Sequence, residues 1–459
     1  MNAIIALSAL AILTMFFGVI QKKSVLLPLI LSGLIIVFFL NVIEWGTFKH
    51  YYNEMFIADN FNIAFTAALI LTTFLVFIFS ALYYRTVKRP LEDIYALMLF
   101  SLIGGITMAS FGNITMLFIG IETLSISFYI LAGSKKFDVA SNEAALKYFL
   151  TGTFATGFLL FGMALIYGVS GSFNLQAINS YIIANKESIP TLFYAGMILV
   201  FVGMAFKIAA VPFHFWAPDV YTGSPTLITA FMSTIGKVAS IAAFYRLISI
   251  TFLNVHDFSV DILMLFAIAT IIVGNLSAMT QDNMKRMLAY SGISNSGYLL
   301  FAIIAMGPKS AGTLLYFSIS YAIATITAFA VIMLVREERG TFSLQDYKGL
   351  AKQNPVEAFA MAVAMMSLAG IPPLAGFMAK YNIFSVAMNG GYVWLVIVGV
   401  IGSMISVFYY FKPIIYMYFH RADAHKKIET TKAYKIHILL VSILLIILGF
   451  LPGLVIGLL

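Results

Sequence analysis

The chain has no cysteine among its 459 residues. This excludes disulfide bonds, thiolate-bound iron–sulfur clusters and covalently attached c-type haem. Only six histidines are present, and His214 alone lies in a stretch apolar enough to reach membrane depth, so haem held by two histidines is not expected either. We therefore expect that this chain carries no electrons and binds no metal.

Charged residues are also scarce: 10% of the chain is Asp, Glu, Lys or Arg, and 61% is hydrophobic. A soluble domain has about 45–50% apolar and about 25% charged residues. The composition therefore predicts a polytopic membrane protein. The net charge of +8 does not indicate nucleic-acid binding, because the basic residues lie in short loops, where they set the orientation of membrane helices.

Apolar stretches long enough to cross a bilayer, about 17–25 residues, recur along the whole chain. They predict an all-α fold, and we interpret the first as a retained span rather than a signal peptide. The fourteen predicted spans are residues 2–20, 24–42, 62–83, 94–111, 113–132, 142–168, 190–211, 225–249, 260–279, 287–306, 311–335, 355–388, 391–417 and 434–458.

The loops between these spans differ in charge. One alternate set of loops holds only Lys49, Lys186 and Lys309. The other set holds Lys22, Lys23, Arg85, Lys88, Arg89, Lys135, Lys136, Lys285, Arg286, Arg336, Arg339, Lys348, Lys352, Arg421, Lys426, Lys427, Lys432 and Lys435. Since basic loops face the cytoplasm, we expect both termini on the non-cytoplasmic side.

Two of the spans are interrupted by proline. Pro212, Pro218 and Pro225 prevent a continuous helix at the end of the seventh span, and Pro372 and Pro373 remove two amide donors from the middle of the twelfth. Backbone freed in this way is tolerated at membrane depth only where protein or a water-filled cavity satisfies it. The breaks therefore indicate a site inside the membrane.

The breaks also indicate an internal repeat. Each is in the fourth span of a five-span group, spans 4–8 and 9–13, and a five-span unit that is repeated once must be inverted. We therefore expect two inverted five-helix repeats with broken helices 7 and 12. The predicted segments are an N-terminal three-helix segment at 1–90, the two repeats at 91–250 and 251–420, and a C-terminal helix at 421–459.

Five charged residues lie inside the apolar stretches: Glu122, Lys147, Lys207, Lys237 and Lys380. A charged side chain at the centre of a bilayer costs about 2.5–3.5 kcal/mol. Burial disfavours the ammonium form of a lysine, and a nearby carboxylate favours it. Movement of a carboxylate towards or away from such a lysine would therefore load or release a proton, which predicts a proton-transfer function.

Simpler explanations exist for some polar residues. Lysines near span ends extend their ammonium groups to the lipid headgroups, which explains Arg246 and Lys412 and equally well Lys147. The other four buried charges have static ion pairing as their alternative. His214, next to the first break, is either a proton relay or a hydrogen-bonded structural histidine.

Span ten is rich in small polar side chains. They either line a hydrated path or hold helices together by hydrogen bonds. These residues are Ser291, Ser294, Asn295, Ser296 and Tyr298.

Several motifs resemble those of a known family, the antiporter-like membrane subunits of respiratory complex I, and most of all its subunit N group. The resemblance runs from roughly residue 60 to 420. The motifs that carry it are LFIGIETLSISFYILAG, NEAALKYFLTGTFATGFLLFG, FKIAAVPFHFWAPDVYTGSPT, MKRMLAYSGISNSGYLL and LAGIPPLAGFMAKYNIF.

The resemblance implies roles for the buried charges. Glu122 is similar to the glutamate of helix five and Lys207 to its partner lysine, whereas Lys237 is similar to the central relay and Lys380 to the lysine on the exit side. Lys147 matches a further lysine of helix six. Asn295 departs from the family, because related chains often have histidine at this position.

The resemblance further implies a proton-translocating subunit of NADH:quinone oxidoreductase in the bacterial inner membrane. Its partners would be sister antiporter-like subunits, other membrane subunits and a peripheral electron-transfer arm. NADH, FMN, iron–sulfur clusters and the quinone are expected on those partners, with no cofactor and no redox chemistry on this chain. Two alternatives are a subunit of a multisubunit cation/proton antiporter and a membrane scaffold with static ion pairs.

Overall fold

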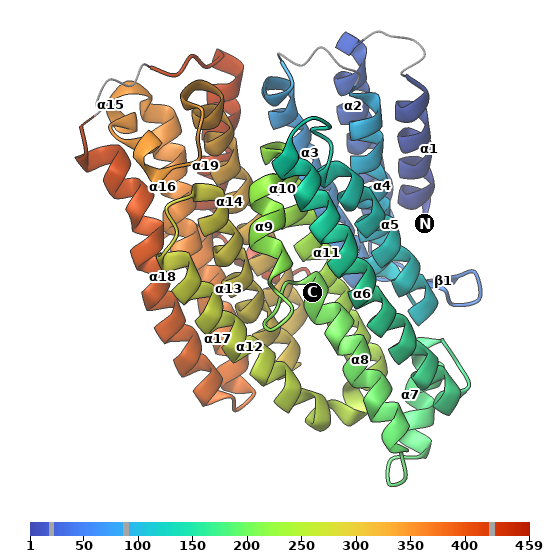
Figure 1. Cartoon of the computed structure of the whole chain (residues 1–459). Helices are drawn as coiled ribbons and strands as arrows, with labels where there is room; N and C mark the ends of the chain where they lie inside the picture. The colour runs from blue at the N-terminus through green and yellow to red at the C-terminus, as the bar shows by residue number, and fades with distance from the viewer. Residues whose placement is uncertain (18–22, 86–90, 422–426) are drawn as a thin grey trace.

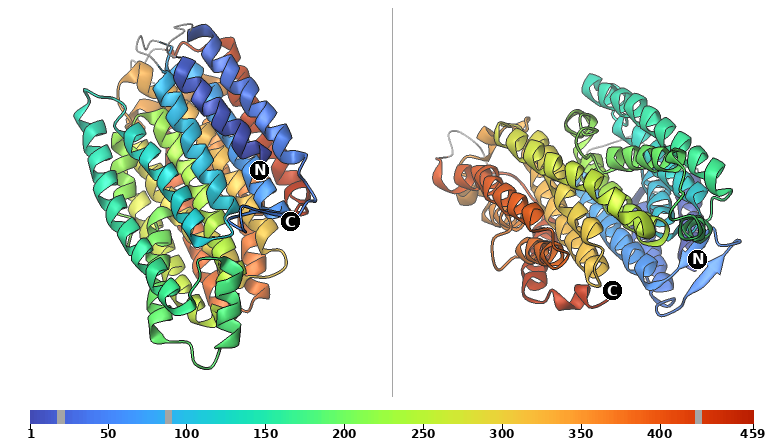
Figure 2. Two further views of the ribbon diagram at one scale, coloured as in Figure 1. Left: turned by 90° about the vertical axis from the view of Figure 1, so that its right-hand side faces the viewer. Right: turned by 90° about the horizontal axis from the view of Figure 1, so that it is seen from below.

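A computed structural model describes residues 1–17, 23–85, 91–421 and 427–459. The described chain is a bundle of helices that run roughly parallel to one another (Figures 1 and 2). In Figure 1 the N-terminal half, coloured blue to green, lies mostly on the right, and the C-terminal half, yellow to red, lies mostly on the left. The end of the first predicted span and the basic residues Lys22, Lys88, Arg89 and Lys426 lie outside the described residues.

The N-terminal segment consists of three helices and a short hairpin. Strands β1 and β2 pair antiparallel, with Lys49 opposite Ala58. The elements are α1 (Asn2–Phe16), α2 (Lys23–Val42), β1 (Lys49–Tyr51), β2 (Phe56–Ala58) and α3 (Asn60–Tyr83).

The middle of the chain contains the first break. Helix α8 ends at Lys207, and α9 does not begin until Trp216. The elements are α4 (Glu92–Ser110), α5 (Ile114–Ala132), α6 (Val139–Ser170), α7 (Leu175–Ala184), α8 (Thr191–Lys207), α9 (Trp216–Gly223), α10 (Thr226–Phe231), the π-helical turn η2 (Met232–Gly236), α11 (Lys237–Leu247), the π-helical turn η3 (Ile248–Phe252) and the 3-10 turn η4 (Leu253–Val255).

The C-terminal part contains the second break, between α16 and α17. The elements are α12 (His256–Met279), α13 (Met284–Ala305), α14 (Ser310–Arg339), the 3-10 turn η5 (Leu344–Tyr347), α15 (Leu350–Gln353), α16 (Pro355–Ala369), α17 (Ala375–Asn389), α18 (Val393–Phe419), α19 (Lys432–Phe450) and α20 (Gly453–Ile456).

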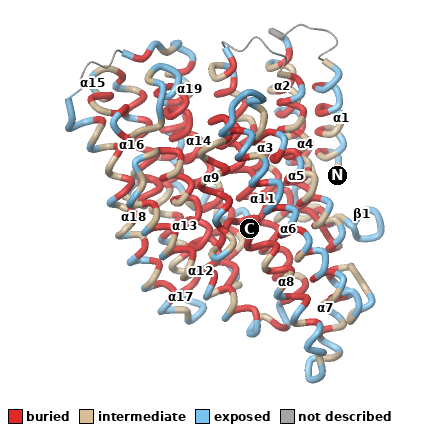
Figure 3. Tube along the Cα trace, viewed as in Figure 1, coloured by how far each residue is buried: buried red, intermediate tan, exposed pale blue. Residues whose placement is uncertain are grey.

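Helices α13 and α14 form the centre of the bundle. Nearly all of their residues are buried, whereas α2, α6, α18 and α19 have large exposed apolar faces (Figure 3). Helix α14 packs against α3, α10, α13, α16, α17 and α19. An apolar outer face with a more polar centre is the arrangement of a protein whose surroundings are lipid, and the polar side chains of α13 therefore lie inside it.

Among the described residues, 10 helices are long and apolar enough to cross a membrane. Shorter apolar helices, α1, α8 and α16, lie within further predicted spans. Every predicted span overlaps a helix, and both predicted breaks are observed. A multi-pass membrane protein is thus confirmed, whereas the count of fourteen crossings and the segment boundaries stay predictions.

Candidate functional site

The breaks expose carbonyl groups that a continuous helix would have paired. In an α-helix the carbonyl of residue i accepts from the N–H of residue i+4. Proline has no N–H, so Pro212 leaves the carbonyl of Ile208 without its helical donor, and Pro373 does the same to Ala369. Both carbonyls accept from a side chain of another helix instead.

The two replacement donors are a serine hydroxyl of α13 and a lysine ammonium group of α17. Ser296 Oγ of α13 donates to Ile208 O at 2.6 Å. Lys380 Nζ of α17 donates to Ala369 O at 3.0 Å. Each break therefore creates an acceptor at membrane depth, and in the second break a buried lysine occupies it.

Lys207 lies at the last residue of α8, opposite helix α5. Its side chain is 9% exposed, and Nζ donates to Ser125 Oγ at 2.6 Å. Glu122 precedes Ser125 by one helical turn, so the two share a face of α5. Glu122 is partly buried and accepts from Thr156 Oγ1 of α6 at 2.9 Å. Glu122 and Lys207 thus face the same region without forming an ion pair in the described chain.

Lys237 begins α11, directly after the π-helical turn η2, and it is 5% exposed. Such turns are rare and often occur at functional sites, because the extra residue redirects the side chains that follow. Lys237 Nζ donates to Gly292 O of α13 and lies 5.1 Å from the ring centre of Tyr321 of α14. The ammonium group is therefore held by a neutral carbonyl and an aromatic face.

Lys380 is 6% exposed and has a similar environment. In addition to Ala369 O, its Nζ lies 3.4 Å from Ser406 Oγ and 5.1 Å from the ring centre of Tyr298. Gly370, at φ +85° where α16 ends, packs against the lysine stem, since a Cβ there would lie 2.9 Å from Lys380 Cδ. The second break thus holds this side chain closely in position.

A small cavity with a mostly apolar lining lies beside Lys380 and Tyr321, and the ring of Tyr321 also faces Lys237. Its volume is about 10 Å³, roughly what one water molecule needs. It is lined by Lys380, by Tyr321, by Asn295 and by Ser320, whose buried Oγ has no partner among the described residues. Asn295 also donates to Ser291 O at 2.9 Å and lies 3.3 Å from Tyr410 Oη. Asn295, for which the resemblance implied a histidine in related chains, therefore lines a cavity that also touches Lys380 and Tyr321.

Lys147 lies elsewhere and is not buried in this chain. Its side chain is 44% exposed and pairs with Glu143 at 2.8 Å and with Asp219 of α9 at 2.9 Å. Arg286 of α13 binds the other oxygen of Asp219 at 2.7 Å. The grouping of Lys147 with the deeply buried charges is therefore wrong, because helical depth alone does not tell which face of α6 a residue occupies.

His214 is in the segment between α8 and α9. Its side chain is 6% exposed, and within the described part of the chain Nδ1 has no hydrogen-bond partner. No bond joins it to any of the lysines described above. The structure places His214 beside the first break, and a relay function stays a prediction.

Two buried cations were not identified as such from the sequence. Arg246, expected to extend to the headgroups, is 1% exposed and pairs with Asp59 at 2.6 Å. Lys285, expected in a loop, is 1% exposed, and its Nζ donates to Thr222 O at 3.0 Å and Ser224 O at 2.6 Å at the end of α9. The interpretation of Arg246 was wrong, because its partner is 187 residues away in the sequence.

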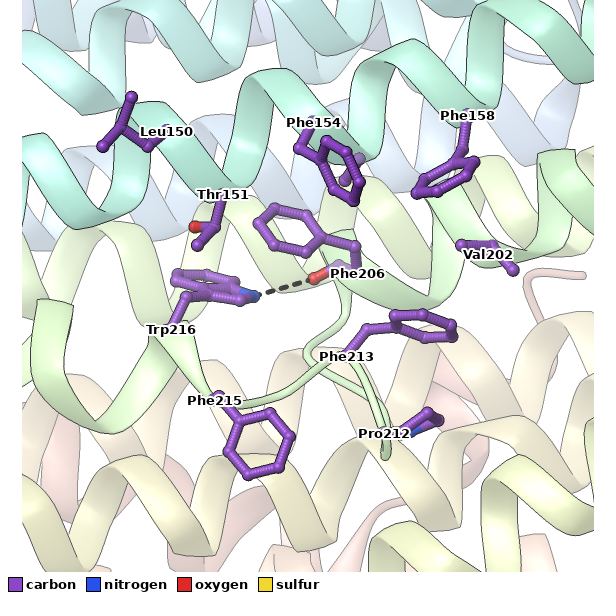
Figure 4. A pocket seen from close by; sticks show the side chains of 11 residues that line it. Leu150, Thr151, Phe154, Phe158, Val202, Phe206, Pro212, Phe213, Phe215 and Trp216 are labelled. Carbon is purple, nitrogen blue, oxygen red and sulfur yellow. Dashed lines mark hydrogen bonds between the residues drawn. The ribbon is translucent and has the colours of Figure 1, made fainter.

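An apolar hollow of about 430 Å³ lies between α6, α8 and the first break (Figure 4). Its few polar atoms are bonded within the chain. Trp216 Nε1 donates to Phe206 O at 3.1 Å, and Thr151 Oγ1 donates to Lys147 O at 2.7 Å. The lining of the hollow is therefore almost entirely apolar, which does not suit a proton path or a polar ligand.

A second cavity, of about 440 Å³, is more polar and lies at the far end of α17. Asn382 and Ser385 of that helix line it together with Lys309 and Thr313. Within the described residues, no group of three His, Cys, Asp or Glu side chains could hold a metal ion.

Comparison with known proteins matches residues 112–406 to the family model of the NADH:quinone oxidoreductase/Mrp antiporter membrane region. NADH-quinone oxidoreductase subunit N of Flavobacterium psychrophilum is 40% identical over 100% of both chains. That of Flavobacterium johnsoniae is 41% identical, also over 100% of both. A chain of respiratory complex I from Thermus thermophilus, solved with bound aureothin, is 29% identical, with a TM-score of 0.85 over 99% of this chain and 98% of that one. The chain therefore belongs to the NADH-quinone oxidoreductase subunit N family.

Proposed function

We propose that the chain is a proton-translocating membrane subunit of respiratory NADH:quinone oxidoreductase, and that its protons move along Glu122, Lys207, Lys237 and Lys380. Glu122 and Lys207 form the inner end of this line, Lys237 is its centre and Lys380 its outer end. Quinone reduction elsewhere in the complex drives the movement. Lys147 of α6 and His214, in the first break, are candidates for further proton-relay roles.

One observation carries the proposal: among the described residues, Lys207, Lys237 and Lys380 form no ion pair with a carboxylate. Lys207, Lys237 and Lys380 are bonded to neutral hydroxyl and carbonyl oxygens, and the ion pairs of the described chain do not include them. An unpaired ammonium at mid-membrane costs about 2.5–3.5 kcal/mol. Intramembrane ionisable residues of this kind mark ion pathways and proton relays.

In a membrane scaffold, buried charges would be expected to form ion pairs, and this chain contains such a pair. Of the arginines that the structure describes, Arg246 is the most deeply buried, and it is paired with Asp59. Removing one partner of such a pair is strongly destabilising, which favours pairing of static buried charges. Lys285 is the exception, because it is buried outside the line and its Nζ donates to the carbonyls of Thr222 and Ser224. The lysine line lacks that pairing, and lysine, unlike arginine, can lose its proton.

The inverted repeat is supported by a bond pattern that occurs in both halves. At the start of α5, Ile114 N donates to Phe173 O at 2.9 Å and Leu175 N donates to Gly112 O at 3.1 Å. At the start of α13, Met284 N donates to Phe342 O at 2.8 Å and Leu344 N donates to Asp282 O at 2.9 Å. The long helices α6 and α14 follow at the same place in each half. We therefore infer that 91–250 and 251–420 are related units.

The remaining assignments follow from membership of a larger complex. The partners are other membrane subunits, including sister antiporter-like subunits, and a peripheral electron-transfer arm that holds NADH, FMN, iron–sulfur clusters and the quinone site. We place the chain in the bacterial inner membrane with both termini on the non-cytoplasmic side, following its basic loops. Redox chemistry then occurs on the partners and not on this chain.

The test is Lys237→Met in the whole complex, reconstituted into liposomes. The ratio of protons pumped to NADH oxidised is expected to fall, because the central proton carrier is gone. Lys412→Gln is the control, since Lys412 Nζ bonds Met279 O at 2.6 Å but is only half-buried. A scaffold predicts normal pumping in both variants. A cation/proton antiporter subunit predicts purification without an electron-transfer arm.

A further inference from the structure

Ser296 of α13 lies between two backbone carbonyls. One follows Lys207 in the chain, and the other accepts the hydrogen bond of Lys237. Its hydroxyl is fully buried, with Oγ 2.6 Å from Ile208 O and 3.2 Å from Gly292 O. Ile208 directly follows Lys207, and Gly292 O accepts the hydrogen bond of Lys237. One side chain therefore contacts the end of α8 and the acceptor of the central lysine.

A serine hydroxyl has one hydrogen, so it donates to one of these carbonyls at a time. A backbone carbonyl has two lone pairs. Gly292 O is filled by the N–H of its own helix, four residues on, and by Lys237 Nζ. Ile208 O has no helical donor, because Pro212, four residues later, has no N–H group. With Lys237 in place, the hydroxyl is therefore directed to Ile208 O, as the shorter distance shows.

The charge on Lys237 decides which of the two carbonyls accepts the hydrogen bond of Ser296. A hydrogen bond from an ammonium group is roughly twice as strong as one between neutral groups. Loss of the proton therefore weakens the hold of Lys237 on Gly292 O and leaves that carbonyl open to the Ser296 hydroxyl. The titratable side chain that faces Lys237 is Tyr321 of α14. The charged side chain next to Ile208, the other acceptor of Ser296, is Lys207.

Rotation of the hydroxyl would release Ile208 O while the rest of the broken segment stays fixed. Val211 N donates to Thr270 Oγ1 of α12 at 2.9 Å, which anchors the far side of the segment. The end of α8 that bears Lys207 is thus the part whose bonding depends on Ser296. Loosening there alters the position of Lys207 relative to Ser125.

We propose that Ser296 is a positioning residue that couples the two inner lysines: it is bonded to Ile208 O while Lys237 is charged and turns to Gly292 O when Lys237 gives up its proton. The inference rests on the proposed proton line. It adds that occupancy of Lys237 controls the position of Lys207, so that a new proton arrives only after the previous one has moved on.

The experiment uses the whole complex in liposomes with Ser296→Ala, alone and combined with Lys237→Met. Ser296→Ala is expected to slow NADH-driven proton pumping by about fivefold, the effect of losing one ordinary hydrogen bond. Ser296→Thr retains the hydroxyl and should restore most of the rate. In the Lys237→Met background, Ser296→Ala should cause no further change. Ser442→Ala is the matched control, because Ser442 is fully buried and, within the described part of the chain, its hydroxyl bonds only Ile438 O of its own helix, at 2.8 Å.

The outcomes separate the two proposals. Normal pumping by Lys237→Met overturns the proton line itself. Reduced pumping by Lys237→Met with normal pumping by Ser296→Ala overturns only the coupling. A fall of the same size from Ser296→Ala with and without Lys237 overturns it as well, because a merely structural serine would act independently of the lysine. Native gels of each variant show whether the complex has assembled.

Discussion

Gly292 lies in the narrow space between Lys237 and Tyr321, and we predict that Gly292→Ala impairs proton transfer while leaving assembly intact. A Cβ at this position would lie 3.0 Å from Tyr321 Oη and 3.2 Å from Lys237 Nζ. Favourable contacts of carbon are at about 3.5–4.0 Å, so both groups must move apart by several tenths of an ångström. The lysine then loses its optimal position against Gly292 O.

The magnitudes decide which effect dominates. Overpacking of a buried site costs about 1–3 kcal/mol. Replacing glycine by alanine within a helix returns about 1 kcal/mol. The net loss of stability is therefore small, and the bundle should assemble. A hydrogen bond from a charged group contributes about 1.5–3 kcal/mol, and losing about 1.4 kcal/mol of it at the rate-limiting transfer slows pumping about tenfold.

The assay is NADH-driven proton uptake by liposomes that contain the complete complex, with NADH oxidation measured in parallel. Gly157→Ala in α6 is the control, because a Cβ there meets nothing within 4 Å. Pumping by Gly292→Ala that equals that of Gly157→Ala would refute the reasoning that the Lys237 ammonium is tightly held.

Three further predictions concern other parts of the molecule. Asp59→Ala leaves the guanidinium group of Arg246 buried without its partner and removes the helix cap that Asp59 gives to Asn62 N. The melting temperature of the purified complex should therefore fall well below that of the control Asp93→Ala, in which an exposed carboxylate is removed. Equal melting temperatures would contradict this. Lys380→Arg should assemble but pump less, since arginine retains its proton, and unchanged pumping would argue against proton release at Lys380. Because the chain has no cysteine, Asn382→Cys in the second cavity should react with a membrane-impermeant maleimide, whereas the buried Ile383→Cys should not. Failure of Asn382→Cys to react would contradict access of water to this cavity.

Local chemistry explains which parts of the site could be predicted from the sequence. The breaks followed from Pro212 and Pro373, because proline removes a helical donor wherever it stands. The burial of Lys237 and Lys380 followed from the length of apolar chain on either side of them. These features depend on residues close together in the sequence, so a single chain contains enough information.

The rest depends on contacts between distant residues. Ser296 bonds Ile208, 88 residues away, and Arg246 pairs with Asp59, 187 residues away. Span ten suggested polar packing, but not which carbonyl each serine reaches. Lys147 shows the same limit. Its position along α6 followed from the sequence, but position along a helix does not tell whether the side chain is exposed. A rule that pairs each proline with the carbonyl four residues earlier would have identified Ile208 O and Ala369 O as acceptors.

The central claim is that protons move between Lys237 and Lys380 through the interior of this chain. It is tested most directly by a high-resolution density map of the assembled complex at the cavity of Asn295, Ser320, Tyr321 and Lys380. We predict an ordered water there, bonded to Ser320 Oγ and to Lys380 Nζ. A dry cavity, with Tyr321 and Lys380 separated by apolar contacts alone, would contradict the account.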